Sequence, residues 1–345
     1  MVPSRKRPVL IIGLFLLLCC LTGFGGVFLF FSLSSRAQPN YPLLIFPTRE
    51  PLSASPSPIA GELPITADEE PAPSALSGPP GKIVYVCQVF RLQPRDQICL
   101  INADGTGERR LTTEDNSRHF YPSFAPDGQS VLFSANLDGN FKIYEMTLAG
   151  QLNKIGDTVG IAPEVSPDNQ SIAFVTGSGG KDYIWVMDRD GSHSRVVYAD
   201  GWDPTWSPDG SRILFATTIK GKPQLASINL DGSDFRQITD LPDLRGRSDW
   251  SAQGDQIVTY SGKTWKRELF IMNPDGSDLR QISPEGGNSQ GPSFSPDGQW
   301  VAFTAYFNAI GNHNACEIYI MRIDGSSLTR LTNNNYCDWQ PRWSP

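Results

Sequence analysis

A seven-residue pattern recurs along most of the chain and constrains the fold more than any other feature. It reads Pro-x-aromatic-Ser-Pro-Asp-Gly, with small departures, and each of the first five copies is followed by an alternating apolar segment typical of a β-strand. The first residues of successive copies lie 41, 41, 44, 44 and 49 positions apart. Such a period indicates one supersecondary unit per copy. The copies begin at Pro122, Pro163, Pro204, Ser248, Pro292 and Pro341.

Each unit continues with a further apolar strand, a tight turn and a last strand. Five of the six turns are Asp-Gly, the strongest short-range hairpin signal, because both residues accept a positive φ. The sixth turn is Ala149-Gly150. Four short antiparallel strands per unit predict the blade of a β-propeller. The Asp-Gly turns are Asp104-Gly105, Asp190-Gly191, Asp231-Gly232, Asp275-Gly276 and Asp324-Gly325.

The incomplete units at the two ends of the repeat region complement each other. The unit that starts at Lys82 lacks a first strand, and the last unit supplies only a first strand, residues 339–343. Together they make one blade, so we predict an all-β, six-bladed β-propeller over residues 81–345, closed by the C-terminal strand. Closure removes exposed sheet edges. The residues expected to pack between blades are Phe124, Val165, Trp206, Trp250, Phe294 and Trp343.

The N-terminal part of the chain predicts a membrane anchor. Residues 9–31 form an apolar run whose only polar side chain is Thr22, and a helix of this length would be about 35 Å long. Basic residues in the segment 1–7 favour a cytoplasmic tail there, a signal-anchor transmembrane helix over 8–33 and an extracytoplasmic remainder. A cleaved signal peptide is the alternative, although the run exceeds the usual apolar region of such peptides.

The segment between the anchor and the repeats has a different composition. Residues 34–80 contain eleven prolines and seven serines and show no apolar period. Such a segment cannot bury enough apolar surface to offset the entropy of ordering it. We therefore expect a disordered tether between the membrane and the propeller.

The repeated units resemble the WD-like Pro-Asp repeats of TolB-type six-bladed propellers over residues 81–345. The resemblance implies a ring of six blades and a binding function, because TolB-like propellers receive partner segments at a tunnel mouth. TolB carries an α/β domain ahead of its propeller and is a soluble periplasmic protein. In this chain an apolar segment and a Pro-rich linker occupy that place.

Composition and motifs argue against several other functions. A net charge of −7 disfavours nucleic acid as a partner, because phosphate binding needs a basic surface. The three histidines, His119, His193 and His313, have no short spacing, and no Gly-x-Ser-x-Gly elbow or Gly-rich phosphate loop precedes a helix. We therefore expect no catalytic residues, no metal and no cofactor. The alternative is an extracytoplasmic hydrolase or lyase acting on glycan or peptide in the tunnel.

Four cysteines lie in the repeat region and predict disulfides. Cys87, Cys99, Cys316 and Cys337 fall at one end of the predicted ring and flank the seam where it closes. Outside the cytoplasm such cysteines form disulfides, with three possible connectivities. The pairs Cys87–Cys99 and Cys316–Cys337 close the shortest loops, and we expect this pairing. A four-cysteine metal site is disfavoured because no Cys-x-x-Cys occurs.

The residues just before each repeat are the most variable positions and mix aromatic with charged side chains. We expect them in loops that enter the first strands and surround a tunnel mouth. Interfaces favour aromatic and Arg anchors, so a protein or peptide partner in the cell envelope is expected there. The alternative is ordinary solvation of the rim, with Trp202 and Trp339 packed on neighbours. The candidate binding residues are His119, Phe120, Tyr121, Trp202, Asp203, Arg245, Arg247, Asp338 and Trp339.

Overall fold

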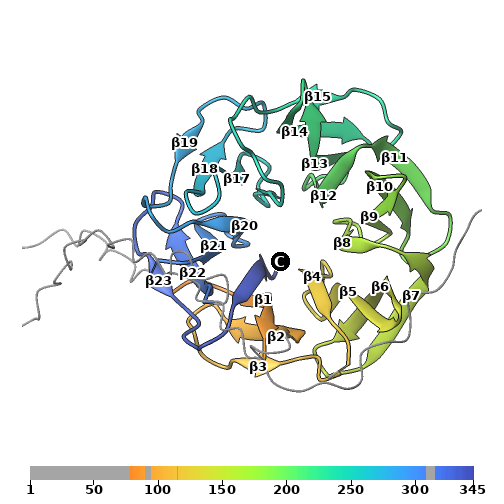
Figure 1. Ribbon diagram of the computed structural model, residues 1–345, viewed down its shortest axis with the longest axis horizontal. Helices are drawn as coiled ribbons and strands as arrows, with labels where there is room; N and C mark the ends of the chain where they lie inside the picture. The colour runs from red at the N-terminus through yellow and green to blue at the C-terminus, as the bar shows by residue number, and fades with distance from the viewer. Residues whose placement is uncertain (1–77, 90–94, 115, 308–314) are drawn as a thin grey trace, which may run out of the picture. The chain divides into compact units, whose positions relative to one another are not determined.

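The computed structural model describes residues 78–89, 95–114, 116–307 and 315–345. These residues form six antiparallel sheets of four strands each, arranged as blades around a central axis (Figure 1). The all-β, six-bladed propeller expected from the repeats is confirmed. No described residue is helical, and the described part of the chain therefore offers no helix that could cross a membrane.

Each blade runs outward from an inner strand at the axis to a short or exposed outer strand. Blade 1 consists of β24 (Asp338–Trp343), β1 (Lys82–Gln88), β2 (Asp96–Asn102) and β3 (Arg109–Arg110). Blade 2 consists of β4 (His119–Phe124), β5 (Ser130–Asp138), β6 (Asn140–Thr147) and β7 (Leu152–Val159). Blade 3 consists of β8 (Ile161–Val165), β9 (Ser171–Ser178), β10 (Lys181–Asp188) and β11 (Arg195–Ala199). Blade 4 consists of β12 (Gly201–Trp206), β13 (Arg212–Ile219), β14 (Lys222–Asn229) and β15 (Arg236–Gln237). Blade 5 consists of β16 (Asp249–Trp250), β17 (Ile257–Ser261), β18 (Glu268–Met272) and β19 (Arg280–Gln281). Blade 6 consists of β20 (Gln290–Phe294), β21 (Trp300–Ala305), β22 (Glu317–Arg322) and β23 (Thr329–Arg330).

The ring closes by pairing its first and last strands. β24 pairs antiparallel with β1, from Ile83 opposite Trp343 to Cys87 opposite Asp338. Beyond this ladder the Ser344 N–H donates to the Lys82 carbonyl at 2.8 Å. The two ends of the propeller are therefore side by side and joined by main-chain hydrogen bonds.

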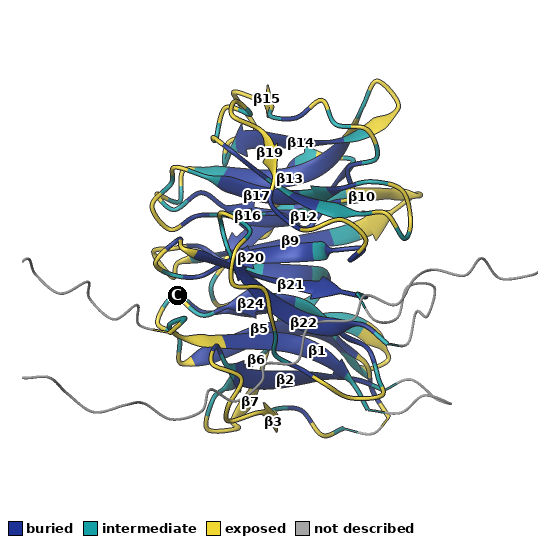
Figure 2. Ribbon diagram, turned by 90° about the vertical axis from the view of Figure 1, so that its left-hand side faces the viewer, coloured by how far each residue is buried: buried dark blue, intermediate teal, exposed yellow. Residues whose placement is uncertain are grey.

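The blades pack face to face through apolar side chains, and exposure is concentrated in the turns and outer strands (Figure 2). The residue two positions after the start of each repeat is buried in five blades, as expected. Trp343, for example, packs with Trp300 and Ile318 of blade 6. The sixth such residue, Trp250, is only half-buried. It belongs to blade 5, whose inner strand β16 has two residues and whose repeat departs most from the pattern.

Both disulfides are present with the expected pairing. Cys87–Cys99 links β1 to β2 with a Cα–Cα separation of 5.8 Å. Cys316–Cys337 links the residue before β22 to the residue before β24, at 4.4 Å between Cα atoms. The second bridge therefore fastens the closing strand to blade 6.

The expected membrane helix, residues 8–33, lies outside the described residues. The same holds for the cytoplasmic tail, residues 1–7, and for the linker as far as residue 77. These three expectations remain predictions from the sequence.

Candidate functional site

The inner strands share a local distortion just before the start of each repeat. In five blades the residue at this position has a left-handed φ between 52° and 62°, and the strand register shifts there in each. An extra residue of this kind is a β-bulge, which re-aims side chains. The five residues are Tyr121, Ala162, Asp203, Gly291 and Gln340.

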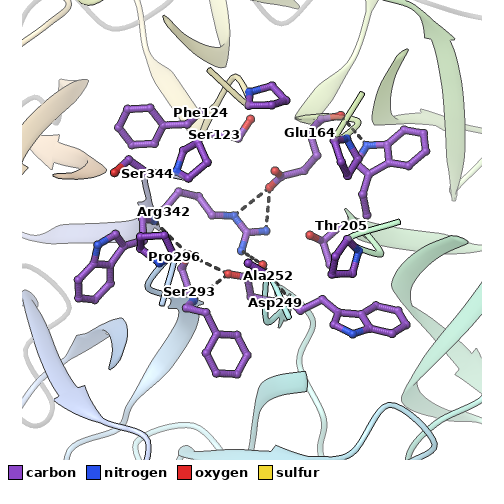
Figure 3. A pocket seen from close by; sticks show the side chains of 18 of the residues that line it. Ser123, Phe124, Glu164, Thr205, Asp249, Ala252, Ser293, Pro296, Arg342 and Ser344 are labelled. Carbon is purple, nitrogen blue, oxygen red and sulfur yellow. Dashed lines mark hydrogen bonds and ion pairs between the residues drawn. The ribbon is translucent and has the colours of Figure 1, made fainter. Parts of the chain in front are cut away.

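The residue after the start of each repeat lines a cavity at the axis, which we call the turn-side cavity (Figure 3). Its volume is about 300 Å³. These six residues are Ser123, Glu164, Thr205, Asp249, Ser293 and Arg342. The rim belongs to the Pro-Asp-Gly turns and is partly exposed, so the cavity opens on that face. Rim residues are Pro126, Pro167, Pro208, Ala252, Pro296 and Pro345.

Arg342 crosses the axis and connects three blades. Its Nη2 lies 2.7 Å from Glu164 Oε1, and its Nε donates to the same oxygen at 2.9 Å. Its Nη1 lies 3.3 Å from Asp249 Oδ1, as Figure 3 shows. The Arg342 residue is only 5 % exposed. The cation is therefore buried and held between two carboxylates at the axis.

Burial and pairing act in opposite directions on these charges. Burial raises the pKa of Glu164, and the adjacent Arg342 opposes that rise. Burial lowers the pKa of Arg342, but Glu164 and Asp249 outweigh it and hold this pKa above its ordinary value. Asp249 Oδ2 also accepts from the Ser293 hydroxyl and the Phe294 N–H, both at 2.9 Å. Both oxygens of Asp249 are therefore occupied within the protein, whereas Arg342 occupies one oxygen of Glu164, Oε1.

A second, smaller space lies on the opposite side of the tunnel, and we call it the loop-side pocket. Its volume is about 150 Å³. Arg247 lies at its wall, with its backbone N–H donating to Asp203 Oδ2 at 2.9 Å and its Nη2 donating to the Pro122 carbonyl at 2.8 Å. The pocket and the turn-side cavity share no residue. The pocket is lined by Tyr121, Asp203, Arg247, Tyr260, Gln290, Gly291, Thr304, Trp339 and Gln340.

A glycine fixes the position of Arg247. Gly246 has a φ of 132°, and a Cβ there would lie 2.5 Å from Asp203 Oδ2 and 2.9 Å from Trp202 Nε1. Only glycine allows this approach, which places the Arg247 N–H against the Asp203 carboxylate. The Arg247 guanidinium also lies over the Tyr121 ring, with 5.6 Å from Cζ to the ring centroid.

The nine candidate residues do not form the loop cluster that we expected. The structure places seven of them inside the inner strands β4, β12 and β24. His119, Arg247 and Asp338 are buried, and among the nine only Arg245 is exposed. The half-buried residues are Phe120, Tyr121, Trp202, Asp203 and Trp339. The expectation of loops is wrong for these seven because five of the six inner strands begin two or three residues before the repeat, whereas Arg245 and Arg247 precede β16 and lie outside a strand.

Four of these residues, Tyr121, Asp203, Arg247 and Trp339, do come together at the loop-side pocket. The others contribute mainly to packing or to polar contacts within the protein. Trp202 packs with Leu214 and Leu244 of the cluster between blades 4 and 5, and its Nε1 donates to the Arg245 carbonyl. His119 packs against the Phe133 ring, and Phe120 packs against the Trp339 ring. Asp338 accepts a hydrogen bond from the Asn334 side chain.

Comparisons with known proteins agree with this architecture. A family model described as the TolB beta propeller domain matches residues 150–310. The structure of TolB from Acinetobacter baumannii superposes with a TM-score of 0.67 at 22 % identity, over 77 % of this chain and 67 % of that one. The described domain is thus a six-bladed β-propeller similar to that of TolB. A putative TolB from Agrobacterium tumefaciens is also similar, with a TM-score of 0.59 and 18 % identity over 77 % of this chain and 99 % of that one.

A sequence relative of the TolB-like propeller covers only a short stretch. An uncharacterized protein of Agrobacterium fabrum is 42 % identical over 59 residues, which is 17 % of this chain and 18 % of that protein. The chain thus matches less than a fifth of this relative's length. The solved structures, at 22 % identity or less, establish the fold and not a shared activity.

The charged residues at the axis of the TolB-like propeller were missed by the sequence analysis. Glu164, Asp249 and Arg342 directly follow the starts of their repeats, and a signal for them existed. At this position three of six copies carry a charge, although both neighbouring positions are apolar or aromatic in nearly every copy. Such a charge inside a buried strand needs a partner, and a ring gives the six positions a common axis.

No metal-binding cluster occurs among the described residues of the TolB-like propeller: no three His, Cys, Asp or Glu side chains lie close enough to hold an ion. Of the two described histidines, His119 is buried in β4 and His193 lies in the turn before β11, where it contacts Asp188. The convergent carboxylates at the axis are paired with Arg342.

Proposed function

We propose that the chain is a membrane-anchored, extracytoplasmic scaffold that binds a protein or peptide partner of the cell envelope in the turn-side cavity. One observation carries this proposal. The tunnel of the propeller has a cavity of about 300 Å³ that opens between the Pro-Asp-Gly turns. A concave site with apolar walls and a few convergent polar groups is the usual form of a binding site.

The walls of this cavity suit a segment of polypeptide. Rigid proline rings and the edges of Phe124, Trp206, Trp250, Phe294 and Trp343 line it, and they offer apolar contact with little side-chain entropy to lose. At the floor, Arg342 contacts Glu164 through Oε1 alone, so the second oxygen of Glu164 is the acceptor that the described contacts leave for a partner. We therefore propose that the partner inserts a basic or N–H-rich side chain.

Two features support the extracytoplasmic, anchored location. Residues 9–31 are long and apolar enough to span a membrane and follow a basic segment. The propeller also contains two disulfides, which persist in oxidising compartments and are rare in the cytosol.

The proposal is tested by affinity capture with the tagged full chain from envelope extracts. Ala252 is exposed and lies on the cavity rim at the one turn that lacks proline. We expect Ala252→Arg to block the cavity, repel a basic segment and reduce capture of the partner about tenfold or more. The matched control is Ala149→Arg, because Ala149 is an exposed residue in a turn of blade 2 that does not line the cavity. Equal capture by both variants would contradict the proposal.

A further inference from the structure

The loop-side pocket contains a buried cation, Arg247, and one acid, Asp203, which accepts from the Arg247 main-chain N–H. Arg247 is 6 % exposed, and within the described residues no carboxylate lies at ion-pair distance from its guanidinium. Its Nε has no hydrogen-bond partner. A buried, incompletely satisfied guanidinium is costly, because burial removes the water that would otherwise solvate the charge.

A second unpartnered polar atom faces the same pocket. Thr304 is 2 % exposed, and its hydroxyl has no hydrogen-bond partner. The amide oxygens of Gln340 and Gln290 are already occupied, by the Tyr121 N–H at 2.9 Å and by Arg267 Nη1 at 2.5 Å. The Gln340 side chain also hydrogen-bonds Tyr121, and the Gln290 side chain hydrogen-bonds Tyr306. The unpartnered donors at the pocket are therefore Arg247 Nε and the Thr304 hydroxyl.

The pocket exists because one side chain is missing from the ring. Gly291 occupies the bulge position that carries Tyr121, Asp203 or Gln340 in other blades, and its φ is 62°. A Cβ placed on Gly291 would meet no atom within 4 Å. The gap therefore lies beside the unpartnered donors and is open to a ligand.

From these contacts we propose that the loop-side pocket binds a small carboxylate, received by Arg247 Nε and the Thr304 hydroxyl. A cavity of about 150 Å³ admits a group of a few heavy atoms, such as a short organic acid or the terminal carboxylate of a peptide. A carboxylate forms its strongest hydrogen bonds with charged donors such as a guanidinium. The site is separate from the turn-side cavity and does not depend on the partner proposed there.

The neighbouring acid is compatible with an anion. Asp203 Oδ2 accepts from the Arg247 backbone N–H, and burial raises the pKa of Asp203. A second carboxylate in the pocket favours the neutral form of Asp203 further, so like-charge repulsion is reduced when the ligand binds.

Calorimetric titration of the detergent-solubilised full chain tests the site. The probes are acetate and propionate as free acids, N-acetylglycine as a mimic of a peptide terminus, and acetamide as the neutral isostere of acetate. We expect saturable binding of at least one carboxylate and no binding of acetamide. A stronger signal from N-acetylglycine would identify a peptide terminus as the source, and a stronger signal from acetate or propionate a free acid. No saturable carboxylate binding, or equal binding of acetamide, would overturn the proposal.

Variants connect the signal to the pocket. Thr304→Val removes a hydroxyl that has no partner in the protein, so it should weaken carboxylate binding about tenfold without lowering the melting temperature. Gly291→Gln copies the residue of blade 1 and should abolish binding by filling the gap. Arg245→Gln, on an exposed neighbour of Arg247, is the control and should leave binding unchanged. Unaltered binding in both pocket variants would contradict the assignment.

Discussion

Arg342 and Glu164 form an ion pair across the tunnel, 2.7 Å apart, although 178 residues separate them in the sequence. Arg342 belongs to the closing strand β24, and Glu164 to the inner strand of blade 3. The strand that closes the ring thus also supplies the cation at the floor of the turn-side cavity. Ring closure and the chemistry of the site are therefore connected through one side chain.

Removing this cation should destabilise the propeller. Arg342→Met leaves Glu164 and Asp249 buried without their partner, and breaking a buried pair in this way costs about 3–5 kcal/mol. Urea unfolding followed by fluorescence measures the loss. Arg110→Met, on an exposed arginine, is the control and should change stability by less than about 0.5 kcal/mol. Equal stability of the two variants would show that the cross-tunnel pair is not a structural element.

Trp202 should behave as a packing residue. Its ring lies against Leu214 and Leu244, and its exposure is intermediate. We expect Trp202→Ala to lower the free energy of unfolding by about 2–3 kcal/mol, less than for a fully buried Trp. Capture of the envelope partner by the folded variant should not change. Loss of capture without loss of stability would return Trp202 to the binding surface.

The second disulfide should contribute to the closure of the ring. The bridge between Cys316 and Cys337 spans 21 positions, and in the chain-entropy model a loop of this size contributes about 3 kcal/mol. Replacing both cysteines by serine should lower stability by that order in thermal unfolding. Peptide mapping without reductant should recover Cys316 linked to Cys337 in the native chain. Free thiols at both positions would contradict this and weaken the case for an oxidising compartment.

Asp338 predicts a dependence of stability on pH. Burial, together with the neighbouring Glu317, raises its pKa from an ordinary 3.8 to about 7. The folded protein then binds the proton more tightly than the unfolded chain. The stability that this proton gives is present below the unfolded pKa, near 4, and is lost as the pH rises toward 7.

The variant Asp338→Asn isolates this contribution. It keeps a neutral side chain at every pH, so it should gain stability relative to the native protein as the pH rises from 4 to 8. Thermal unfolding of both proteins over this pH range measures the difference in their stability. The contributions of the other titrating groups are common to both proteins and cancel in this difference. A difference that does not vary with pH would contradict the raised pKa.

The sequence predicted the ring but not the direction of its inner side chains. The repeats fixed six blades, the seam between residues 82 and 343, and the cysteine pairing, because these follow from strand count and spacing. The residues before each repeat were assigned to loops, whereas in five blades a bulge keeps them in the inner strands. A left-handed φ at Tyr121 or Asp203 has no sequence signature, since either residue is also common elsewhere.

The same limit applies to the axis of the propeller. The positions of Glu164 and Arg342 in the repeat were visible, but their pairing depends on a register that places two distant blades opposite each other. Gly291 gave a weaker signal, because a glycine at a strand start is more often a turn residue than the origin of a pocket. Sequence periodicity therefore located the tunnel, and only the structure showed that it contains two separate sites.

Site-specific photo-crosslinking on the full chain tests the central proposal most directly. A benzophenone amino acid is placed at Ala252, on the rim of the turn-side cavity, or at Lys263, which is exposed at the opposite end of the same blade. If a partner binds in the cavity, position 252 gives one discrete crosslinked protein in the envelope and position 263 gives none. Crosslinking from position 263 with none from 252 would contradict the account.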